Sequence, residues 1–464
     1  MKKELLKNTL IIGIGRISTQ FMALFLIPLY TMFLSTSEYG LGDLVITYAA
    51  LALPLLTLSL EQGAFRLLVD ARNNDTQKTN IISFVFKVMS LLLLPLTAVV
   101  LAVGYFTQLP IIGVALLYIV SAILLNVHLW LARGLGGSVK YSIGSIATGV
   151  TSLILSILFV GSLGWGVTGM LTALSIGNLV GMTYLYIALK IGKYIQFRNK
   201  DRQTNKELLG YSLPLIPNTI SWWLINAADR TIITMMLGIS MVGVYAVSVK
   251  FPAILIGLFS IFWISWHESA SLHIDHKDRN EFFSKVTNTS IVLFGTIGLL
   301  ILAGLSVAFK YIVGNEFSEA YIYIPILMLG ALSHSIITLY GSIYAAKKKT
   351  KQILYTTLSA AAINIIVILS LINIIGLYAA AIASVVAYLA LAIYRHIDIR
   401  KFVTITIDKK RVVLLALLAI PVVALYYINL PYLNILSCLI VALGGLSLNR
   451  GIISSVKELI WQKK

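Results

Sequence analysis

The sequence predicts an all-α polytopic membrane protein with about fourteen transmembrane helices. Hydropathy divides the 464 residues into fourteen apolar stretches of about twenty residues, the length that crosses a bilayer as a helix. A mean hydropathy of +0.91 and a 58% content of hydrophobic residues leave no room for soluble domains. Thirty-two of the thirty-six lysines and arginines fall on one side of the membrane when alternate loops are placed together. Under the positive-inside rule that side is the cytoplasm.

Short polar connections separate the apolar stretches. The first stretch is too long for a signal peptide and has no small-residue cleavage site, so we expect it to remain as a helix. An even number of crossings places both termini in the cytoplasm, and Lys310 is then the one basic residue in an outer connection. In chain order the stretches cover residues 8–33, 40–68, 82–106, 110–133, 140–163, 166–190, 209–237, 242–266, 286–309, 322–345, 353–373, 376–396, 412–428 and 432–449.

The net charge of +18 follows from this topology. In a soluble protein it would indicate nucleic acid binding, whereas here the cations lie in cytoplasmic loops beside anionic lipids of the inner leaflet. We therefore expect membrane lipids, and no nucleic acid, as partners. The single cysteine, Cys438, excludes an internal disulfide and a CxxC metal site.

The connections limit the possible functions. None is large enough for an ATPase domain and no GxxxxGK motif occurs, so energy must come from a gradient or from the substrate. A glycan polymerase or ligase needs an acidic outer loop to activate an acceptor hydroxyl. Only the outer connection at residues 310–321, with Glu316 and Glu319, is long enough to fold over a substrate. A polytopic polymerase or ligase is therefore disfavoured.

Two glycine patterns resemble known motifs. Gly164, Gly166 and Gly169 spell GxGxxG, but no βαβ unit surrounds them, so we interpret them as a tight outer turn. Gly177 and Gly181 form GxxxG in the sixth span, which favours close packing within the helix bundle over dimerisation.

Five residues with metal-binding side chains follow the eighth span. They lie in a hydrophilic segment and do not match the HExxH spacing of a zinc site. A solvated cytoplasmic loop is the better interpretation. The five residues are His267, Glu268, His273, Asp275 and His276.

The first six spans and the next six show a faint duplication in parallel orientation. Six spans separate the copies, so both halves have the same topology and their pseudo-twofold axis runs along the membrane normal. We expect two six-helix lobes facing a central cavity, with the last two helices as an appendage. Leu34, Ser37 and Gly40 at the first outer turn recur 203 residues later as Leu237, Ser240 and Gly243.

The repeat predicts the domain organisation. The predicted divisions are an N-lobe at residues 1–190, a cytoplasmic linker at 191–208, a C-lobe at 209–396, a second linker at 397–411, and the last two helices with a basic cytoplasmic tail at 412–464.

Few ionisable residues lie within the spans, and each is costly unless it faces a cavity or a partner. Arg16 and Glu61 each lie about 10–12 Å from the cytoplasmic ends of their helices, a depth at which they can pair. With Arg66 they form a predicted inner cluster. The alternatives are a structural ion pair that fixes helix register and, for Arg66, a side chain that extends to the cytoplasmic interface.

A second predicted cluster lies toward the outer side. Asp229, Arg230 and Lys250 lie seven to eight residues from the outer ends of the seventh and eighth spans, so Asp229 and Lys250 can pair. Asp43 lies near the outer mouth. For Asp229, as for Glu61, a purely structural role is an equal alternative.

The cations and the carboxylates suggest different roles. Three intramembrane cations against few acids leave surplus positive charge, which indicates an anionic cargo, and a phosphate or pyrophosphate matches the bidentate geometry of arginine. The predicted substrate-binding residues are Arg16, Arg66, Arg230 and Lys250. The predicted coupling or gating residues are Asp43, Glu61 and Asp229.

Three segments resemble the polysaccharide-transport (Wzx-like, oligosaccharide flippase) branch of the multidrug/oligosaccharidyl-lipid/polysaccharide (MOP) flippase superfamily, which also contains MATE exporters and lipid II flippases. They are residues 27–65 (IPLYTMFLSTSEYGLGDLVITYAALALPLLTLSLEQGAF), 226–250 (NAADRTIITMMLGISMVGVYAVSVK) and 345–351 (AAKKKTK). The resemblance covers the whole chain and implies a MATE-like, V-shaped pair of lobes with alternating access. Arg16 and Lys250 stand where lipid II flippases place cavity cations in the first and eighth spans.

The resemblance also implies a function. It is a flippase, not an enzyme, that moves undecaprenyl-(pyro)phosphate-linked oligosaccharide from the inner to the outer leaflet for capsule, O-antigen or teichoic acid synthesis. We expect a monomer in the bacterial cytoplasmic membrane, with polysaccharide-assembly enzymes as partners. No cofactor is expected, and a proton or sodium ion is the hypothetical coupling ion. The alternative is a MATE-like cation-coupled exporter of small molecules, which would require an excess of acidic residues in the cavity.

Overall fold

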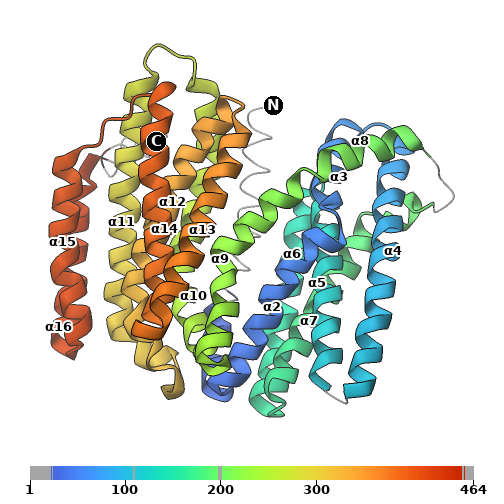
Figure 1. The fold of residues 1–464 in the computed structure, drawn as a ribbon, viewed down its shortest axis with the longest axis horizontal. Coiled ribbons are helices and arrows are strands. Elements are labelled where there is room, and N and C mark those ends of the chain that lie inside the picture. The colour runs from blue at the N-terminus through green and yellow to red at the C-terminus, as the bar shows by residue number, and fades with distance from the viewer. Residues whose placement is uncertain (1–21, 23, 108–109, 197–200, 452–453, 455–464) are drawn as a thin grey trace, which may run out of the picture. The chain divides into compact units, whose positions relative to one another are not determined.

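The computed structural model describes residues 22, 24–107, 110–196, 201–451 and 454, and the regular structure in this part of the chain is helical throughout (Figure 1). Twelve of its helices are long and apolar enough to cross a membrane. Two further predicted crossings correspond to the shorter apolar helix Leu24–Phe33 and to α9(Leu215–Leu237). The prediction of an all-α polytopic membrane protein is confirmed, and the count of fourteen crossings is approximate.

The chain divides by packing into two compact units. Unit 1 comprises Met1–Thr234 and Gly238–Gly243, and unit 2 comprises Met235–Leu237 and Val244–Lys464. The repeat assigns α9 to the second half of the chain, whereas α9 packs mainly within unit 1, so the lobe boundaries stay a prediction. Besides Leu24–Phe33 and α9, unit 1 contains α2(Thr36–Leu56), α3(Leu60–Asp70), α4(Asp75–Thr107), α5(Pro110–Gly134), α6(Ser138–Ser156), η1(Ile157–Ser162), α7(Gly166–Ala188), η2(Ile191–Tyr194) and α8(Arg202–Ser212).

Unit 2 contains most of α10 and all of the later helices. Its elements are α10(Ile239–His273), α11(Arg279–Ile312), η3(Asn315–Phe317), α12(Ala320–Ala346), α13(Thr350–Ile375), α14(Tyr378–Asp398), η4(Ile399–Lys401), α15(Lys409–Ile428) and α16(Pro431–Leu448).

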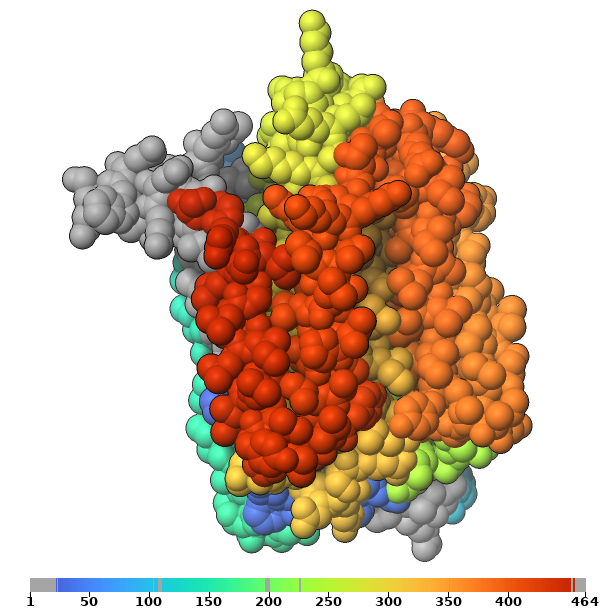
Figure 2. Space-filling view, turned by 90° about the vertical axis from the view of Figure 1, so that its left-hand side faces the viewer, coloured from blue at the N-terminus to red at the C-terminus, as the bar shows by residue number. Residues whose placement is uncertain are grey.

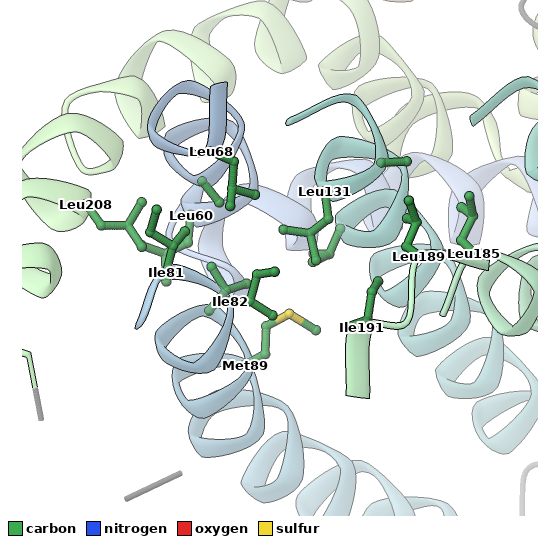
Figure 3. Packing of buried hydrophobic residues seen from close by; sticks show 14 of the residues in the cluster. Leu60, Leu68, Ile81, Ile82, Met89, Leu131, Leu185, Leu189, Ile191 and Leu208 are labelled. Atoms are coloured by element: carbon green, nitrogen blue, oxygen red, sulfur yellow. The ribbon is translucent and has the colours of Figure 1, made fainter. Parts of the chain in front are cut away.

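The core of unit 1 joins helices that are distant in sequence (Figure 3). Leu60 and Leu68 of α3, Ile82 of α4, Leu131 of α5 and Leu208 of α8 are all fully buried in it. Interiors of this kind are close-packed, so these contacts fix the position of α3. The position of α3 matters because it carries Glu61.

The second predicted span, residues 40–68, is broken in the structure. α2 ends at Leu56, and Leu58 and Ser59 adopt left-handed φ angles of 52° and 53° before α3 begins. Pro54, in the last turn of α2, lacks the N–H that would continue the helical hydrogen bonds. The expectation of one continuous helix was therefore wrong. Neither left-handed residue is glycine, so the sequence gives little sign of the break.

Two predicted loops are partly helical. α10 continues to His273, so His267, Glu268 and His273 lie on a helix and the prediction of a solvated loop was wrong for them. The imidazole of His273 stacks on Phe282, with ring centroids 4.1 Å apart, which stabilises this extension. On the other side, α11 runs to Ile312 and α12 begins at Ala320, so the outer connection is shorter than expected.

The structure confirms a turn at the first glycine pattern and close helix packing at the second, while the outer position of the turn stays a prediction. Gly164 and Gly166 form a turn with φ angles of 65° and 58°, and α7 begins at Gly166. A Cβ atom on Gly177 would lie 2.0 Å from Ser152 Oγ of α6, and one on Gly181 would lie 2.0 Å from Thr148 Oγ1 of the same helix. The GxxxG pattern thus allows α6 and α7 to pack closely within unit 1.

Arg395, near the end of the predicted span at residues 376–396, is buried in unit 2 with 1% of its surface exposed. Its guanidinium donates to the Thr356 hydroxyl (2.9 Å from Nη2), the Thr357 hydroxyl (3.2 Å) and the Ile337 carbonyl (3.0 Å). Further bonds come from Nε to Thr356 and from Nη2 to Ile353. Arg395 therefore joins α14 to α12 and α13.

Candidate functional site

One face of α2 carries a row of small and polar residues that meets α9 and the start of α10. The row consists of Thr36, Gly40, Asp43 and Thr47, whose spacing of four, three and four residues places them on one side of the helix. Their partners on the other helices are Ser240, Gly243, Arg230 and Trp223. We call this contact the outer seam, because it begins at the predicted outer ends of the helices. All eight residues belong to unit 1.

The helix ends in the outer seam approach each other very closely. The hydroxyl oxygens of Thr36 and Ser240 lie 2.6 Å apart. A Cβ atom on Gly40 would lie 2.3 Å from the Ile239 carbonyl oxygen, and one on Gly243 would lie 2.0 Å from the Thr36 carbonyl oxygen. Only glycine fits at either position. Gly40 and Gly243 are equivalent in the internal repeat, so the contact is formed reciprocally by the two halves of the sequence.

A buried ion pair lies deeper in the outer seam. Arg230 Nε donates to Asp43 Oδ2 at 2.6 Å, and Arg230 Nη1 donates to Asp229 Oδ1 at 3.4 Å. The exposed fractions are 4% for Asp43, 2% for Asp229 and 9% for Arg230. Asp43 follows the start of α2 by seven residues and Arg230 precedes the end of α9 by seven, so both lie about 10 Å from that end of the helices.

Aromatic and hydroxyl groups surround the ion pair. Tyr48 and Thr231 share a hydrogen bond of 2.8 Å between their hydroxyl oxygens, and Trp223 Nε1 donates to the Thr47 carbonyl oxygen at 2.9 Å. Tyr39, which is 3% exposed, lies near enough to interact electrostatically with both Asp43 and Arg230. Burial of the three charged side chains strengthens their attraction and raises the cost of leaving one unpaired.

The outer seam contains two carboxylates and one guanidinium, and the predicted surplus of cations, which also counts Arg16 and Lys250, stays a prediction. In this conformation Arg230 is engaged by Asp43 and Asp229. Lys250, predicted to pair with Asp229, is partly buried on α10 and belongs to unit 2. Its pairing with Asp229 stays a prediction.

The predicted inner cluster is described in part, because Arg16 lies outside the described residues. Glu61 is 1% exposed and accepts a hydrogen bond from Thr57 Oγ1 at 2.6 Å. The same hydroxyl lies 2.8 Å from the Leu53 carbonyl oxygen. One hydroxyl proton cannot fully serve both acceptors, and a proton on Glu61 would remove the competition. Arg66 points elsewhere: its Nη1 donates to Asp70 at 2.7 Å, and its side chain is 50% exposed.

Sequence reasoning missed the direct contact between the repeated glycines and the pairing of Arg230 with Asp43. Both signals were present: the repeat relates Gly40 to Gly243, and Asp43 and Arg230 lie at equal depth from the same side. The sequence does not identify which helices face each other, and the predicted pairs joined only helices that follow one another in the chain.

Unit 2 contains a separate apolar groove with a volume of about 720 Å³. Helices α11, α12, α14 and α15 supply most of its lining, and Figure 2 shows the face of unit 2 where the red residues of α15 and α16 lie. Ser333, Tyr340 and Tyr427 are the only residues with polar side chains that line it, among the described part of the chain. A groove of this composition suits a hydrocarbon chain.

Comparisons with known proteins agree with this fold. A family model for polysaccharide biosynthesis proteins matches residues 5–266, more than half of the chain. The solved structure of the lipid II flippase MurJ in an inward closed conformation has a TM-score of 0.69 and 17% identity, covering 96% of this chain and 100% of that one. An inward-facing MATE family transporter of the MOP superfamily has a TM-score of 0.64 and 14% identity, covering 84% of this chain and 98% of that one.

An outward-facing MATE family transporter gives a TM-score of 0.58 at 16% identity, covering 86% of this chain and 95% of that one. At these identities the likeness to solved structures is one of fold. A comparison with curated protein sequences gives no match. The family match, together with the helical architecture, shows that the chain belongs to the polysaccharide biosynthesis protein family of the MOP flippase superfamily.

Proposed function

We propose that the protein moves an undecaprenyl-(pyro)phosphate-linked oligosaccharide from the inner to the outer leaflet of the bacterial cytoplasmic membrane, by alternating access, for cell-surface polysaccharide synthesis. The observation that carries the proposal is the outer seam. Its contacts join helices that the repeat assigns to different halves, and its side-chain contacts are ionic or hydrogen-bonded rather than apolar. Contacts of this kind can separate and form again when each partner finds a substitute.

Arg230 has a natural substitute for Asp43 in the cargo. A phosphate can present two oxygens to the guanidinium, as a carboxylate does, and it carries more charge. When the outer seam opens, Arg230 loses Asp43 and the phosphate takes its place, while Asp229 stays beside the arginine. Arg16, Lys250 and Arg66 are proposed as further phosphate-binding residues on the path.

The apolar groove accounts for the lipid part of the cargo. A polyprenyl chain has no hydrogen-bonding groups, and the groove supplies almost none. Burial of such a chain among apolar side chains costs nothing relative to the bilayer, so the groove guides the chain without holding it tightly. The sugar and phosphates would then cross in a polar environment while the chain stays in an apolar one.

Glu61 is the proposed coupling residue. It is buried, its Thr57 contact is compatible with a protonated carboxyl group, and it lies directly after the break between α2 and α3. Carboxyl groups in such positions are suited to gain and lose a proton or to bind a sodium ion during transport. Asp43 and Asp229 serve as gating residues in the outer seam.

A reversible cross-link tests the proposal. In a Cys438→Ala background, Thr36→Cys with Ser240→Cys places two thiols where hydroxyl oxygens now lie 2.6 Å apart. Oxidation should stop transport of the lipid-linked sugar, and reduction should restore it, because a disulfide holds the outer seam closed. Each single cysteine variant is the control and should transport under both conditions. Undiminished transport by the fully cross-linked protein would refute a seam that must open.

The same cells identify the cargo. Depletion of the protein should accumulate a lipid-linked oligosaccharide that an externally added glycan-cleaving enzyme cannot reach. An accumulated intermediate exposed on the outer leaflet would instead indicate polymerisation or ligation.

A second candidate function, export of small organic cations, is favoured by one observation: the outer seam has two carboxylates for one arginine. In that case depletion would leave the lipid-linked pool unchanged and raise sensitivity to cationic compounds.

A further inference from the structure

The three glycines of the turn before α7 are arranged around one tryptophan, Trp165. Gly164 and Gly166, on either side of it, have left-handed φ angles of 65° and 58°, which favour glycine. A Cβ atom on Gly169 would lie 2.9 Å from the Trp165 Cβ and 3.1 Å from the Phe159 carbonyl oxygen, so a larger residue does not fit there. The GxGxxG pattern therefore holds Trp165 in a defined position.

The backbone of Trp165 is hydrogen-bonded in both directions along the chain. Its N–H donates to the Phe159 carbonyl oxygen at 2.9 Å. Its carbonyl oxygen accepts from the Thr168 hydroxyl at 2.6 Å and from the Gly169 N–H at 3.2 Å. Phe159 lies in the π-helical turn η1, and turns of this kind are rare and frequent at functional sites.

The indole ring of Trp165 is held in place and yet exposed. It stacks on the Phe159 ring, with centroids 4.7 Å apart and an angle of 17° between the ring planes. Even so, 49% of Trp165 is exposed. Phe159 covers one face of the indole and leaves the opposite face open, and indole Nε1 has no hydrogen-bond partner among the residues that the structure describes. A tryptophan that only anchors the protein at the membrane interface needs the right depth and not this fixed orientation.

A carboxylate lies against the residue that follows Trp165. Glu38, in the first turn of α2, accepts hydrogen bonds on Oε2 from the Ser35 N–H and hydroxyl, both at 3.0 Å. Its other oxygen, Oε1, reaches the start of α7, since a Cβ atom on Gly166 would lie 2.2 Å from it. Within the described part of the chain no donor is bonded to Oε1. One oxygen of Glu38 thus caps α2, and the other is available to a ligand.

We propose that Trp165 and Glu38 form a carbohydrate-binding site for the sugar of the cargo, an inference that rests on the proposed function. A pyranose ring presents C–H groups that pack on the electron-rich face of an aromatic ring, and hydroxyl groups that both donate and accept hydrogen bonds. Trp165 supplies the open ring face and the Nε1 donor. Glu38 supplies the acceptor, and its negative charge excludes phosphate from the site.

The site adjoins the outer seam within unit 1. Thr36, where the outer seam begins, precedes Glu38 by two residues, and α2 and α7 are neighbours (Figure 1). Glu38 precedes Asp43 by five residues, about 7.5 Å along α2. Arg230, the partner of Asp43, would bind the phosphate, so the phosphate and the sugar of one cargo molecule would meet two separate sites. The carbohydrate site would take the sugar when the outer seam opens.

A chemical footprint tests the site in the unaltered protein. The probe is the oligosaccharide released by mild acid from the lipid-linked pool that accumulates on depletion. Purified protein is oxidised with N-bromosuccinimide with and without this probe, and mass spectrometry follows each tryptophan. The oligosaccharide should slow oxidation of Trp165 severalfold and leave that of Trp130, at the other end of unit 1, unchanged. Inorganic pyrophosphate should not protect Trp165, because Glu38 repels it.

Two variants test the two parts of the site. Glu38→Gln keeps an oxygen for the Ser35 cap but places an amide donor where Oε1 would accept, so the half-protecting oligosaccharide concentration should rise about tenfold. Trp165→Ala removes the ring and should slow transport of the lipid-linked oligosaccharide severalfold in proteoliposomes. The matched control, Phe106→Ala, removes another exposed aromatic ring at the end of α4 and should transport at the wild-type rate.

The outcomes separate the two proposals. Three results would overturn the carbohydrate site and leave the flippase function standing: oxidation of Trp165 that the oligosaccharide does not slow, protection by pyrophosphate, or equal transport by Trp165→Ala and Phe106→Ala. An unchanged half-protecting concentration in Glu38→Gln would remove Glu38 from the site. If depletion accumulates no lipid-linked oligosaccharide, the proposed function is wrong and this inference is wrong with it.

Discussion

Two buried arginines, one in each unit, are compensated in different ways. Arg230 of unit 1 is bonded to the carboxylates of Asp43 and Asp229. Arg395 of unit 2 is bonded to hydroxyl and carbonyl oxygens, and no carboxylate among the described residues lies within ion-pair distance of it. Both are costly positions for a charge, and both are occupied by the side chain with the most hydrogen-bond donors.

The difference concerns what each arginine can exchange. The neighbours of Arg395 are fixed parts of the α12 and α13 backbone and side chains, so its bonds are a permanent fastening of unit 2. The neighbours of Arg230 are charged, and one of them comes from a helix that the repeat assigns to the other half of the sequence. An anionic ligand can replace Asp43 at Arg230, whereas no ligand can replace the hydroxyl and carbonyl oxygens of α12 and α13 that bind Arg395.

The largest effect should follow from Arg230→Gln. Removing one partner of a buried ion pair costs about 3–5 kcal/mol and here leaves two carboxylates without their cation. We expect transport to fall to background with membrane abundance retained, and Asp43→Asn should act similarly. Asp229→Asn should be milder, because its oxygen lies 3.4 Å from Arg230 rather than 2.6 Å.

The exchange variant Asp43→Arg with Arg230→Asp provides the control. It should keep the closed outer seam and recover the stability lost in the single variants, yet transport less, since the cation then lies on α2 instead of α9. Full transport by this variant would show that the pair is structural only, like the fastening at Arg395.

The fold was largely predictable from the sequence, because apolar length and the distribution of lysine and arginine depend on the bilayer and not on tertiary detail. The break at Leu58 and Ser59 was not, since it depends on how α3 packs with α4, α5 and α8. Burial of Arg395 was hidden for a similar reason. A cation near a helix end has the same sequence signature whether it extends to the interface or turns inward.

The candidate site was predictable in its residues and not in its partners. Asp43, Asp229 and Arg230 were identified because charges within apolar spans are rare. Their pairing depends on which helices face each other across unit 1, which a single sequence does not encode in its periodicity. At the outer seam Arg230 meets two acids, and the expected surplus of cations stays a prediction because it also counts Arg16 and Lys250.

An intermediate effect is expected for Glu61→Gln, which removes a titratable group from the interior of unit 1. Glutamine keeps the size of the side chain and a hydrogen-bond acceptor for Thr57, so the fold should be retained. If Glu61 carries a coupling proton, transport should fall severalfold and no longer respond to a proton gradient imposed across proteoliposomes. A gradient response equal to that of wild-type protein would exclude Glu61 from coupling. Thr57→Val, which removes the donor alone, is the matched control and should leave the response in place.

For Arg395→Leu we expect lower stability with little change in transport per folded molecule. The substitution leaves the acceptors around the guanidinium unpaired, at about 1–3 kcal/mol for each buried group. Thermal unfolding in detergent should show a lower Tm, and Arg395→Lys should lie between, since lysine cannot reproduce the planar fork. If Arg395→Leu kept a normal Tm but failed to transport, Arg395 would have to act on the cargo path, and the proposed difference between Arg395 and Arg230 would be wrong.

The smallest change in Tm should come from loss of an exposed ion pair, and it serves as the reference for the effects at the two buried arginines. Lys347 Nζ lies 2.5 Å from Asp275 Oδ1, and the Asp275 side chain is 78% exposed. The hydrogen bond and charge of Lys347 lower the pKa of Asp275. A carboxyl group with a lowered folded-state pKa stabilises the fold above its ordinary pKa and loses that contribution as the pH falls through the lowered value. The difference in Tm between wild-type protein and Asp275→Asn should therefore be slight at neutral pH and vanish in acid. A large difference in Tm, or one that grew in acid, would mean that this exposed ion pair contributes as much to stability as the buried ones. Burial would then not be sufficient to explain the contrast between Arg230 and Arg395.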